Sequence, residues 1–224
     1  MADADEASIR MDVLDDEQRE ALRALGSEVR YPAEHTIFLE GEPSHSVLFI
    51  QEGHLKVTQR DTDREVILAI RGEDELIGEE GVLMDEPRSA TVTTITPVTA
   101  LDIRAADLIE FVKRYDLWVV MYRAAVRRRR QSDHYAMLAR LDVRSRLARW
   151  LVALADEAEL GEKVQDGWAI GAALSQQDFA GRIGASRDAV AIELRRFRDQ
   201  KLVSTGRRKI VIHDLEALRQ ISLL

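Results

Sequence analysis

The sequence predicts an α+β protein, with an N-terminal antiparallel β-roll, a long helix, and a compact helical domain that carries a small hairpin. Three observations support this order. Strand-like runs recur about every ten residues over positions 30–104, a long helical stretch follows them, and two helical patterns flank Gly184. Because no helices separate the strand-like runs, their spacing favours an antiparallel barrel or roll over a parallel sheet.

The N-terminal part is expected to begin with a short amphipathic helix and to continue as strands. The helix spans about Leu14–Leu25, with apolar residues on one face and Asp15-Asp16-Glu17 near its start. Turn signals rich in Gly, Pro and Asp separate the strand-like runs. The most regular predicted strands are Thr36–Leu39, Val47–Ile50, His54–Val57, Val66–Ile70 and Ala90–Ile95.

Strand character ends near Ile103, and helices are expected over Ala105–Val112 and about Asp116–Ala139. In the second, side chains recur at a spacing of 3 to 4, as in a coiled-coil seam with a polar centre. The seam positions are Leu117, Val120/Met121, Ala124, Arg127/Arg128, Gln131, His134/Tyr135 and Leu138. Two interpretations stay open: this helix pairs two copies of the chain, or it caps the roll with Arg127–Arg130 as a solvated face.

The C-terminal part has the pattern of a helix-turn-helix. A helix is expected over Arg144–Glu159, and Ser175–Asp178 forms a capping-box pattern for a second helix that ends at Ile183. Gly184 supplies the turn, and Ser186 caps a third helix. The buried stripe of that helix is expected to be Val190, Leu194 and Phe197.

A small hairpin is expected after the third helix. Strands over Leu202–Ser204 and Lys209–Ile212 flank Thr205–Arg208, so the tip of the hairpin is basic. A basic tip of this kind is typical of the wing that follows a helix-turn-helix in DNA-binding domains.

Composition excludes several classes of protein. The chain contains no cysteine, which excludes disulfides, thiolate metal sites and cysteine-ligated iron–sulfur clusters. Its start lacks the basic and apolar regions of a signal peptide, and no apolar run approaches the roughly 20 residues that span a bilayer. A cytoplasmic protein with no membrane partner is therefore expected. No metal cluster, nucleophile–base motif or phosphate loop is found, so no catalytic and no metal-binding residues are predicted.

Charge is distributed unevenly. The net charge is −8, yet residues 1–141 carry −10, residues 142–224 carry +2, and residues 178–209 alone carry +5. Because affinity for DNA depends on the local field at the phosphates, a basic face on an acidic protein is sufficient for binding. The acidic half is not expected to contact DNA.

Nearly the whole chain resembles the CRP/FNR superfamily, the cyclic-AMP receptor protein and its relatives. The resemblance rests on strings that occur in the family's order: Phe38–Glu42, Glu52–Val57, Leu76–Glu79, Pro87–Thr91 and Leu141–Val143. It implies an effector-binding β-roll over residues 1–113, a dimerisation helix and hinge over 114–141, and a winged helix-turn-helix over 142–224.

The expected ligand is a small molecule with a phosphate. The Arg88 guanidinium can pair at two points with a cyclic phosphodiester, and Ser89 and the amides of Ser89 and Ala90 can add donors. Gly78 allows close approach of the backbone, and the resemblance implies that Glu79 accepts hydrogen bonds from a ribose hydroxyl. A surface ion pair is the alternative role for Arg88.

Recognition of the base is less regular. The resemblance places the base-contacting residues at Gln131 and Ser132, where Gln131 departs from the family's usual threonine. Glu80 also departs, since an apolar residue commonly follows Gly-Glu there, and a second carboxylate disfavours an anionic ligand unless it points outward. Cyclic AMP is the favoured effector. Another cyclic nucleotide, a different effector or none remain alternatives, while scattered single histidines do not favour haem.

The DNA-binding residues are expected around the second helix of the helix-turn-helix. Arg187 is suited to guanine O6 and N7, and the shorter Asp188 to a cytosine amine. The family's second base-reading arginine falls at Ile192, so the operator is expected to differ from that of the best-known members. A surface salt bridge is the alternative role for Arg187. The predicted DNA-contacting set is Ser175, Gln177, Ser186, Arg187, Asp188, Arg207, Arg208 and Lys209.

The resemblance implies a homodimer that reads a near-palindrome of double-stranded DNA, with RNA polymerase as a further partner. Ligand bound between roll and long helix would change the hinge and set the two recognition helices about one DNA turn apart. Two alternatives belong to other classes of protein. A constitutive DNA-binding protein would use the roll only as an interaction module, and an enzyme would need a catalytic motif that the chain lacks.

Overall fold

The computed structural model describes six stretches of the chain, which are residues 14–61, 64–138, 141–156, 161–170, 174–206 and 209–223. The contacts divide the chain into two compact units. One contains residues 1–59 and 68–133, and the other contains residues 60–67 and 134–224.

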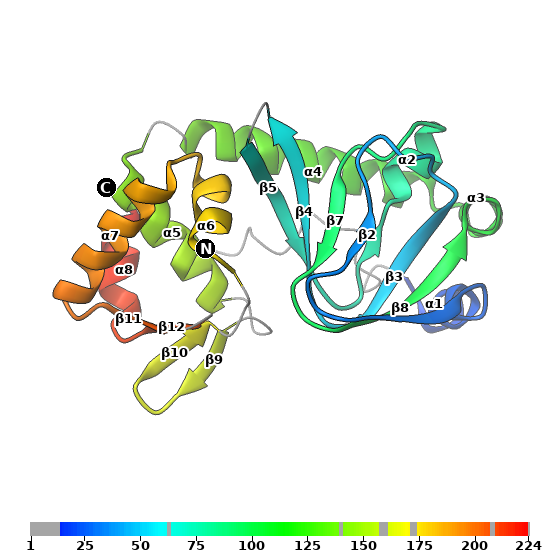
Figure 1. Ribbon diagram of the computed structural model, residues 1–224. Helices are drawn as coiled ribbons and strands as arrows, with labels where there is room; N and C mark the ends of the chain where they lie inside the picture. The colour runs from blue at the N-terminus through cyan, green and yellow to red at the C-terminus, as the bar shows by residue number, and fades with distance from the viewer. Residues whose placement is uncertain are drawn as a thin grey trace. The chain divides into compact units, whose positions relative to one another are not determined.

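Two four-stranded sheets form the roll, and all of their residues except 60–67 belong to the first unit (Figure 1). One sheet has the order β1 (Ser27–Tyr31), β8 (Val98–Arg104), β3 (Ser46–Glu52), β6 (Leu76–Ile77). The other has the order β2 (Thr36–Phe38), β7 (Thr91–Thr94), β4 (Leu55–Asp61), β5 (Arg64–Arg71). The registered pairs in both sheets are antiparallel, which confirms the predicted roll.

Strand β3 is buried on both of its faces, and it separates two apolar cores. Because side chains alternate along a strand, Val47 and Phe49 join one core while Leu48 and Ile50 join the other. The second core also contains residues of β2, β4, β6, β7 and β8. Burial on both faces explains why this strand reads as an unbroken apolar run rather than as an alternating pattern.

Helices cover the first of these cores. They are α1 (Asp16–Arg23), α2 (Glu79–Met84), α3 (Ala105–Arg114) and α4 (Trp118–Leu138). Helix α1 begins with a capping box, in which the Asp15 side chain accepts from the Gln18 amide and the Gln18 side chain accepts from the Asp15 amide. Leu22, Leu108 and Phe111 pack with Val47 and Phe49 in this core.

The long helix α4 corrects part of the predicted seam. Leu117, which directly precedes the helix, Met121 and Ala124 are buried in the roll's own core. The expectation that they line a seam between two helices is therefore wrong for these three positions. The exposed apolar residues lie on another face, where Val119 is 55% and Tyr122 is 71% exposed. The side chains of Gln131, His134, Tyr135 and Leu138 lie outside the described residues.

The second unit contains helices and a third sheet. The helices are α5 (Val143–Asp156), α6 (Gln176–Ile183), α7 (Arg187–Asp199) and α8 (Leu215–Ser222). The sheet has the order β11 (Val203–Gly206), β12 (Lys209–Ile212), β10 (Gly167–Ile170), β9 (Gly161–Val164). The predicted helices and the two strands of the wing are present; β9, β10 and α8 are not among the predicted elements.

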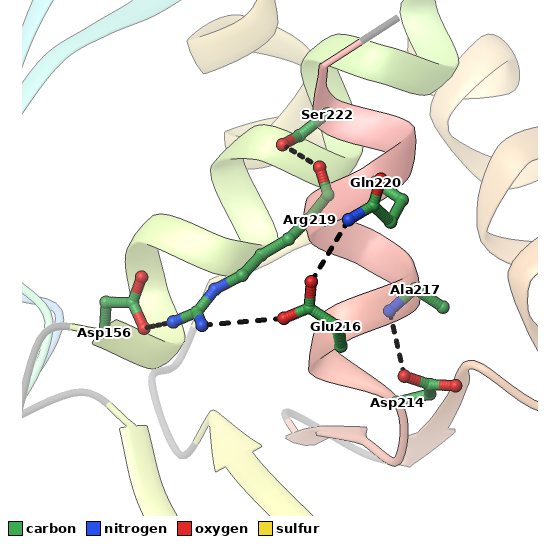
Figure 2. A network of polar contacts seen from close by, with 7 residues as sticks. All are labelled: Asp156, Asp214, Glu216, Ala217, Arg219, Gln220 and Ser222. Atoms are coloured by element: carbon green, nitrogen blue, oxygen red, sulfur yellow. Dashed lines mark hydrogen bonds and ion pairs between the residues drawn. The ribbon is translucent and has the colours of Figure 1, made fainter. Parts of the chain in front are cut away.

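Helix α8 is attached to α5 by polar contacts as well as by packing (Figure 2). Arg219 of α8 pairs with Asp156 at the end of α5, with Nη2 and Oδ1 2.7 Å apart. In the opposite direction, Arg149 of α5 donates to the carbonyl oxygen of Ser222 at 2.9 Å. Asp214 caps α8 by accepting from the amide of Ala217. The last helix thus closes the apolar face of α5.

Among the described residues, no helix is both long and apolar enough to cross a membrane. No group of three or more His, Cys, Asp or Glu side chains in the described part of the chain is arranged to hold a metal ion.

Asp142 caps α5, because its Oδ1 accepts from the Ser145 amide at 2.7 Å. The hydrogen bond from Ser145 holds the pKa of Asp142 below the ordinary value of 3.8. Asp142→Ala is expected to lower the free energy of unfolding by about 1 kcal/mol, because an N-cap is lost. The loss should be present at neutral pH and should fade as the pH falls through the lowered pKa.

Chemical unfolding at pH 7 and at pH 3 measures both effects. Asp142→Asn is the matched variant, since asparagine caps a helix about as well and does not titrate. An alanine variant as stable as the wild type at pH 7 would contradict the capping role.

Candidate anion-binding site and nucleic-acid interface

Two backbone hydrogen bonds hold Arg88 in place. Its amide donates to the Glu42 carbonyl at 2.7 Å, and its carbonyl accepts from the Gly41 amide at 2.9 Å. The loop that ends in Asp85-Glu86-Pro87 therefore pairs with the turn after β2. This pairing fixes the direction in which the Arg88 side chain leaves the chain.

The guanidinium of Arg88 points into the roll. The residue is 7% exposed; Nη1 donates to the Gly78 carbonyl at 3.0 Å and Nη2 to the Ser46 carbonyl at 2.7 Å. Its central carbon lies 3.6 Å from the centroid of the Phe38 ring, as in a cation–π contact. Arg88 thus connects the start of β3 with the end of β6.

The positive charge of Arg88 is buried without an ion pair to any described residue, and burial lowers the pKa of its guanidinium. The carboxylates of Asp102, Glu42 and Glu79 act from a greater distance and in the opposite direction. The alternative of a surface ion pair is therefore wrong for this residue. Two of the five guanidinium N–H groups are used by backbone carbonyls, so donors and charge remain for an anion.

Gly78 is required by the way Arg88 is seated. Its φ of +85° lies in the left-handed region, and a Cβ there would collide with Nη1 of Arg88 and stand 2.9 Å from Cε2 of Phe38. The sequence correctly indicated a close approach at Gly78. The described partners in that approach are the arginine and the ring.

The other predicted ligand residues lie in two neighbouring segments. Glu79 is 3% exposed in the first turn of α2, and Ala90 is buried just before β7. Ser89 is exposed, and its hydroxyl donates to Oε2 of Glu80 at 3.2 Å. Gln131 and Ser132 belong to α4, but their side chains lie outside the described residues, so the structure does not test their role.

The contact between Glu80 and Ser89 was not foreseen. The glutamate is exposed, as an outward-pointing residue would be, yet it occupies the hydroxyl that was expected to donate to a phosphate. The sequence signal was the second carboxylate after Gly78. Phe38 was also missed as a residue of the site, although it belongs to a string on which the family resemblance rests.

In the second unit, α6 and α7 form the predicted helix-turn-helix. Gly184 ends α6 with a φ of 62°, and Ser186 caps α7 by accepting from the Ala189 amide at 3.2 Å. The predicted stripe of Val190, Leu194 and Phe197 is buried. The opposite face of α7 is thereby left exposed.

That exposed face carries Arg187 and Asp188 at its start. Arg187 forms no ion pair with a described residue, so the surface salt bridge considered for it is not present in the described part of the chain. Arg195 is also exposed, about two turns further along the same helix, and was missed by sequence reasoning although its spacing from Arg187 indicates the same face. Arg196 instead pairs with the buried Glu193 at 2.6 Å.

The remaining predicted DNA contacts lie beside these helices. Ser175 caps α6, and its hydroxyl exchanges hydrogen bonds with Asp178, so its donor is already used within the capping box. Gln177 and Lys209 are exposed. Arg207 and Arg208 lie outside the described residues, so the structure does not test their role.

Comparisons with known proteins agree with both halves of this picture. Residues 28–115 match the cyclic nucleotide-binding domain family, and residues 145–221 match the Crp-like helix-turn-helix domain family. The chain is 30% identical over 222 residues to the CRP-like cAMP-activated global transcriptional regulator of Mycobacterium tuberculosis, covering 96% of this chain and 97% of that protein.

Two further relatives show how widely the likeness extends. The cAMP-activated global transcriptional regulator CRP of Haemophilus influenzae is 29% identical over 189 residues, which cover 82% of this chain and 83% of that protein. In fold, the chain is similar to the c-di-GMP-responsive global regulator CLP of Xanthomonas campestris, with a TM-score of 0.77 and 24% identity over 89% of this chain and 99% of that one.

The match to a cyclic nucleotide-binding domain, the match to a Crp-like helix-turn-helix and the full-length relatives agree with each other and with the geometry. The relatives are transcription regulators and not enzymes. The chain belongs to the CRP/FNR family of transcriptional regulators.

Proposed function

We propose that this regulator is a homodimer whose DNA binding is switched by a cyclic nucleotide, with cyclic AMP as the favoured effector, bound between the roll and α4. The buried guanidinium of Arg88, which forms no ion pair with a described residue, is the observation that carries this proposal. A buried cation is costly unless it is paired with an anion.

A cyclic phosphodiester would fit the charge of this site. It carries one negative charge, and it would compensate the burial that now lowers the pKa of Arg88. The planar guanidinium can donate to two phosphate oxygens at once. Glu79, which is also buried, would accept hydrogen bonds from a ribose hydroxyl. Ser89, the Ser89 and Ala90 amides, Gln131 and Ser132 complete the proposed ligand contacts.

The proposed DNA surface is the exposed face of α7 together with the wing. Arg187 would read guanine in the major groove. Contacts to the DNA phosphates would fix the position of the protein on the duplex. They would come from Ser175, Gln177, Ser186, Arg207, Arg208 and Lys209. Asp188 would accept from a cytosine amine. In a dimer, the two recognition helices would lie about 34 Å apart on a near-palindrome.

We further propose the functional division into an effector-binding roll over 1–113, a dimerisation helix and hinge over 114–141, and a DNA-binding domain over 142–224. The exposed Val119 and Tyr122 of α4 support pairing along this helix, because large apolar side chains on one helix face usually meet a partner. RNA polymerase would be a further partner of the DNA-bound dimer.

A second candidate function is that of a family member with a different effector or none. The hydrogen bond from Ser89 to Glu80 favours it, because an exposed carboxylate stands where a phosphate would otherwise accept. Cyclic AMP that changes DNA affinity in a gel-shift titration supports the first candidate. DNA affinity that no cyclic nucleotide changes supports the second.

Arg88→Ala is expected to abolish cyclic AMP binding in calorimetry. It should also lower the free energy of unfolding of the roll by about 2–3 kcal/mol, since two hydrogen bonds from a charged donor are lost. Basal DNA binding should stay measurable, because the helix-turn-helix is untouched.

Arg88→Lys keeps the charge without the planar fork, and about tenfold weaker binding is expected in a folded protein. Arg104→Ala, which removes an exposed arginine of β8 paired with Asp107, is the matched control and should bind normally. Unchanged cyclic AMP affinity in the alanine variant would show that Arg88 does not bind the ligand.

Glu80→Gln is expected to strengthen cyclic AMP binding by about threefold to fivefold, because it removes one exposed negative charge beside the proposed phosphate position. The gain should shrink as the salt concentration rises. Calorimetry in 50 mM and 300 mM salt measures both effects, and Glu86→Gln in the adjacent loop is the control. Equal affinity of wild type and Glu80→Gln at low salt would contradict the assignment.

Tyr122→Asp is expected to shift the protein from dimer to monomer, since it places a charge on the apolar face of α4 that we assign to the dimer contact. Sedimentation velocity measures the change. Arg123→Asp, at the next exposed position of the same helix, is the control. A monomeric wild type would contradict the proposed homodimer, and a Tyr122→Asp variant that stays dimeric would place the dimer contact elsewhere.

A further inference from the structure

Among the described residues of α7, Ile192 is the one large apolar side chain that is exposed, at 53%. In contrast, Val190, Leu194 and Phe197 of the same helix pack inward. Ala191, beside Ile192, is half-exposed and extends the apolar surface. Helical propensity does not explain an exposed isoleucine, because a β-branched residue is not preferred at a surface position of a helix.

The neighbours of Ile192 on this face are charged. Arg187 and Asp188 lie about one turn before it, and Arg195 lies about one turn after it. Neither Arg187 nor Arg195 forms an ion pair with a described residue. An apolar partner protein would have to cover these two arginines, whereas DNA would place phosphates and guanine acceptors against them. Charge therefore selects nucleic acid as the occupant of this face.

We propose that Ile192 reads the C5-methyl group of a thymine. The operator of this protein would then differ from that of the best-known family members at one position in each half-site. The thymine methyl is the apolar group that base edges present in the major groove. This inference rests on the proposed DNA-binding function and adds the base that the middle of α7 selects.

The helix also sets the spacing of this contact. Ile192 lies five positions after Arg187, which corresponds to about 7.5 Å along the helix axis. The two side chains are therefore expected to contact different base pairs of the same half-site.

The test begins with the full-length protein and a random duplex library, with and without 1 mM cyclic AMP. Each thymine of the selected duplex is then replaced singly by deoxyuridine, which removes only the methyl group. One thymine in each half-site is expected to be sensitive. Replacing it in one half-site should weaken wild-type binding about fourfold, and replacing it in both half-sites should weaken binding about fifteenfold.

Ile192→Ala should bind the thymine and deoxyuridine duplexes equally, while Ile192→Arg should select guanine at the same position. Leu223→Ala removes another apolar side chain of this unit, which is 73% exposed. This control should bind the deoxyuridine duplex more weakly than the thymine duplex, by the same factor as the wild type. Thermal unfolding confirms that each variant is folded.

Equal sensitivity of wild type and Ile192→Ala to deoxyuridine would overturn the contact, because another residue would then read the methyl group. Wild-type binding that no single deoxyuridine weakens would overturn it as well, while leaving DNA binding intact. A wild-type protein that enriches no sequence, with or without cyclic AMP, would contradict the proposed DNA-binding function itself and the base contact with it.

Discussion

The first unit depends on one buried cation. The Arg88 guanidinium is bound by the carbonyls of Ser46 and Gly78 and rests on the Phe38 ring, so it joins β2, β3 and β6 around a charge that burial disfavours. The fold thus holds a positive charge inside the roll at a cost in solvation. Such a group is suited to respond to an anion, because an arriving phosphate changes its environment more than it would change that of an exposed arginine.

Apolar packing holds the start of α4 to the roll. Strand β3 is apolar on both faces, and one of its faces packs with residues at the start of α4. The inward positions at the start of the long helix are occupied by the roll, which leaves Val119 and Tyr122 exposed on the face that we propose for dimer contact. A helix that serves the core on one face and a dimer on the other would connect a ligand in the roll with the geometry of the pair.

Two of the departures from the family pattern, Glu80 and Ile192, are expected to act on different parts of the proposed function. Glu80 affects the ligand, because it binds the Ser89 hydroxyl and adds negative charge where a phosphate would lie. Ile192 affects the DNA, because it replaces a hydrogen-bonding side chain by an apolar one on the exposed face of α7. We therefore expect single substitutions at these two positions to change effector sensitivity and operator choice separately.

The sequence by itself determined the fold class, the helix-turn-helix and its caps, because period, glycine turns and capping residues are local signals. Gly184, Ser186 and the stripe of Val190, Leu194 and Phe197 are examples. It also identified Arg88 and Gly78 as residues of one site.

Only the tertiary structure decided how those residues meet. Arg88 turned out to be buried, Gly78 to make room for it, and Glu80 to bind Ser89. The strands β9 and β10 and the helix α8 also required it, because their stability comes from pairing with β12 and packing on α5 rather than from local pattern. Contacts between segments far apart in the chain leave little trace in a single sequence, whereas caps and periodic stripes are written within a few turns.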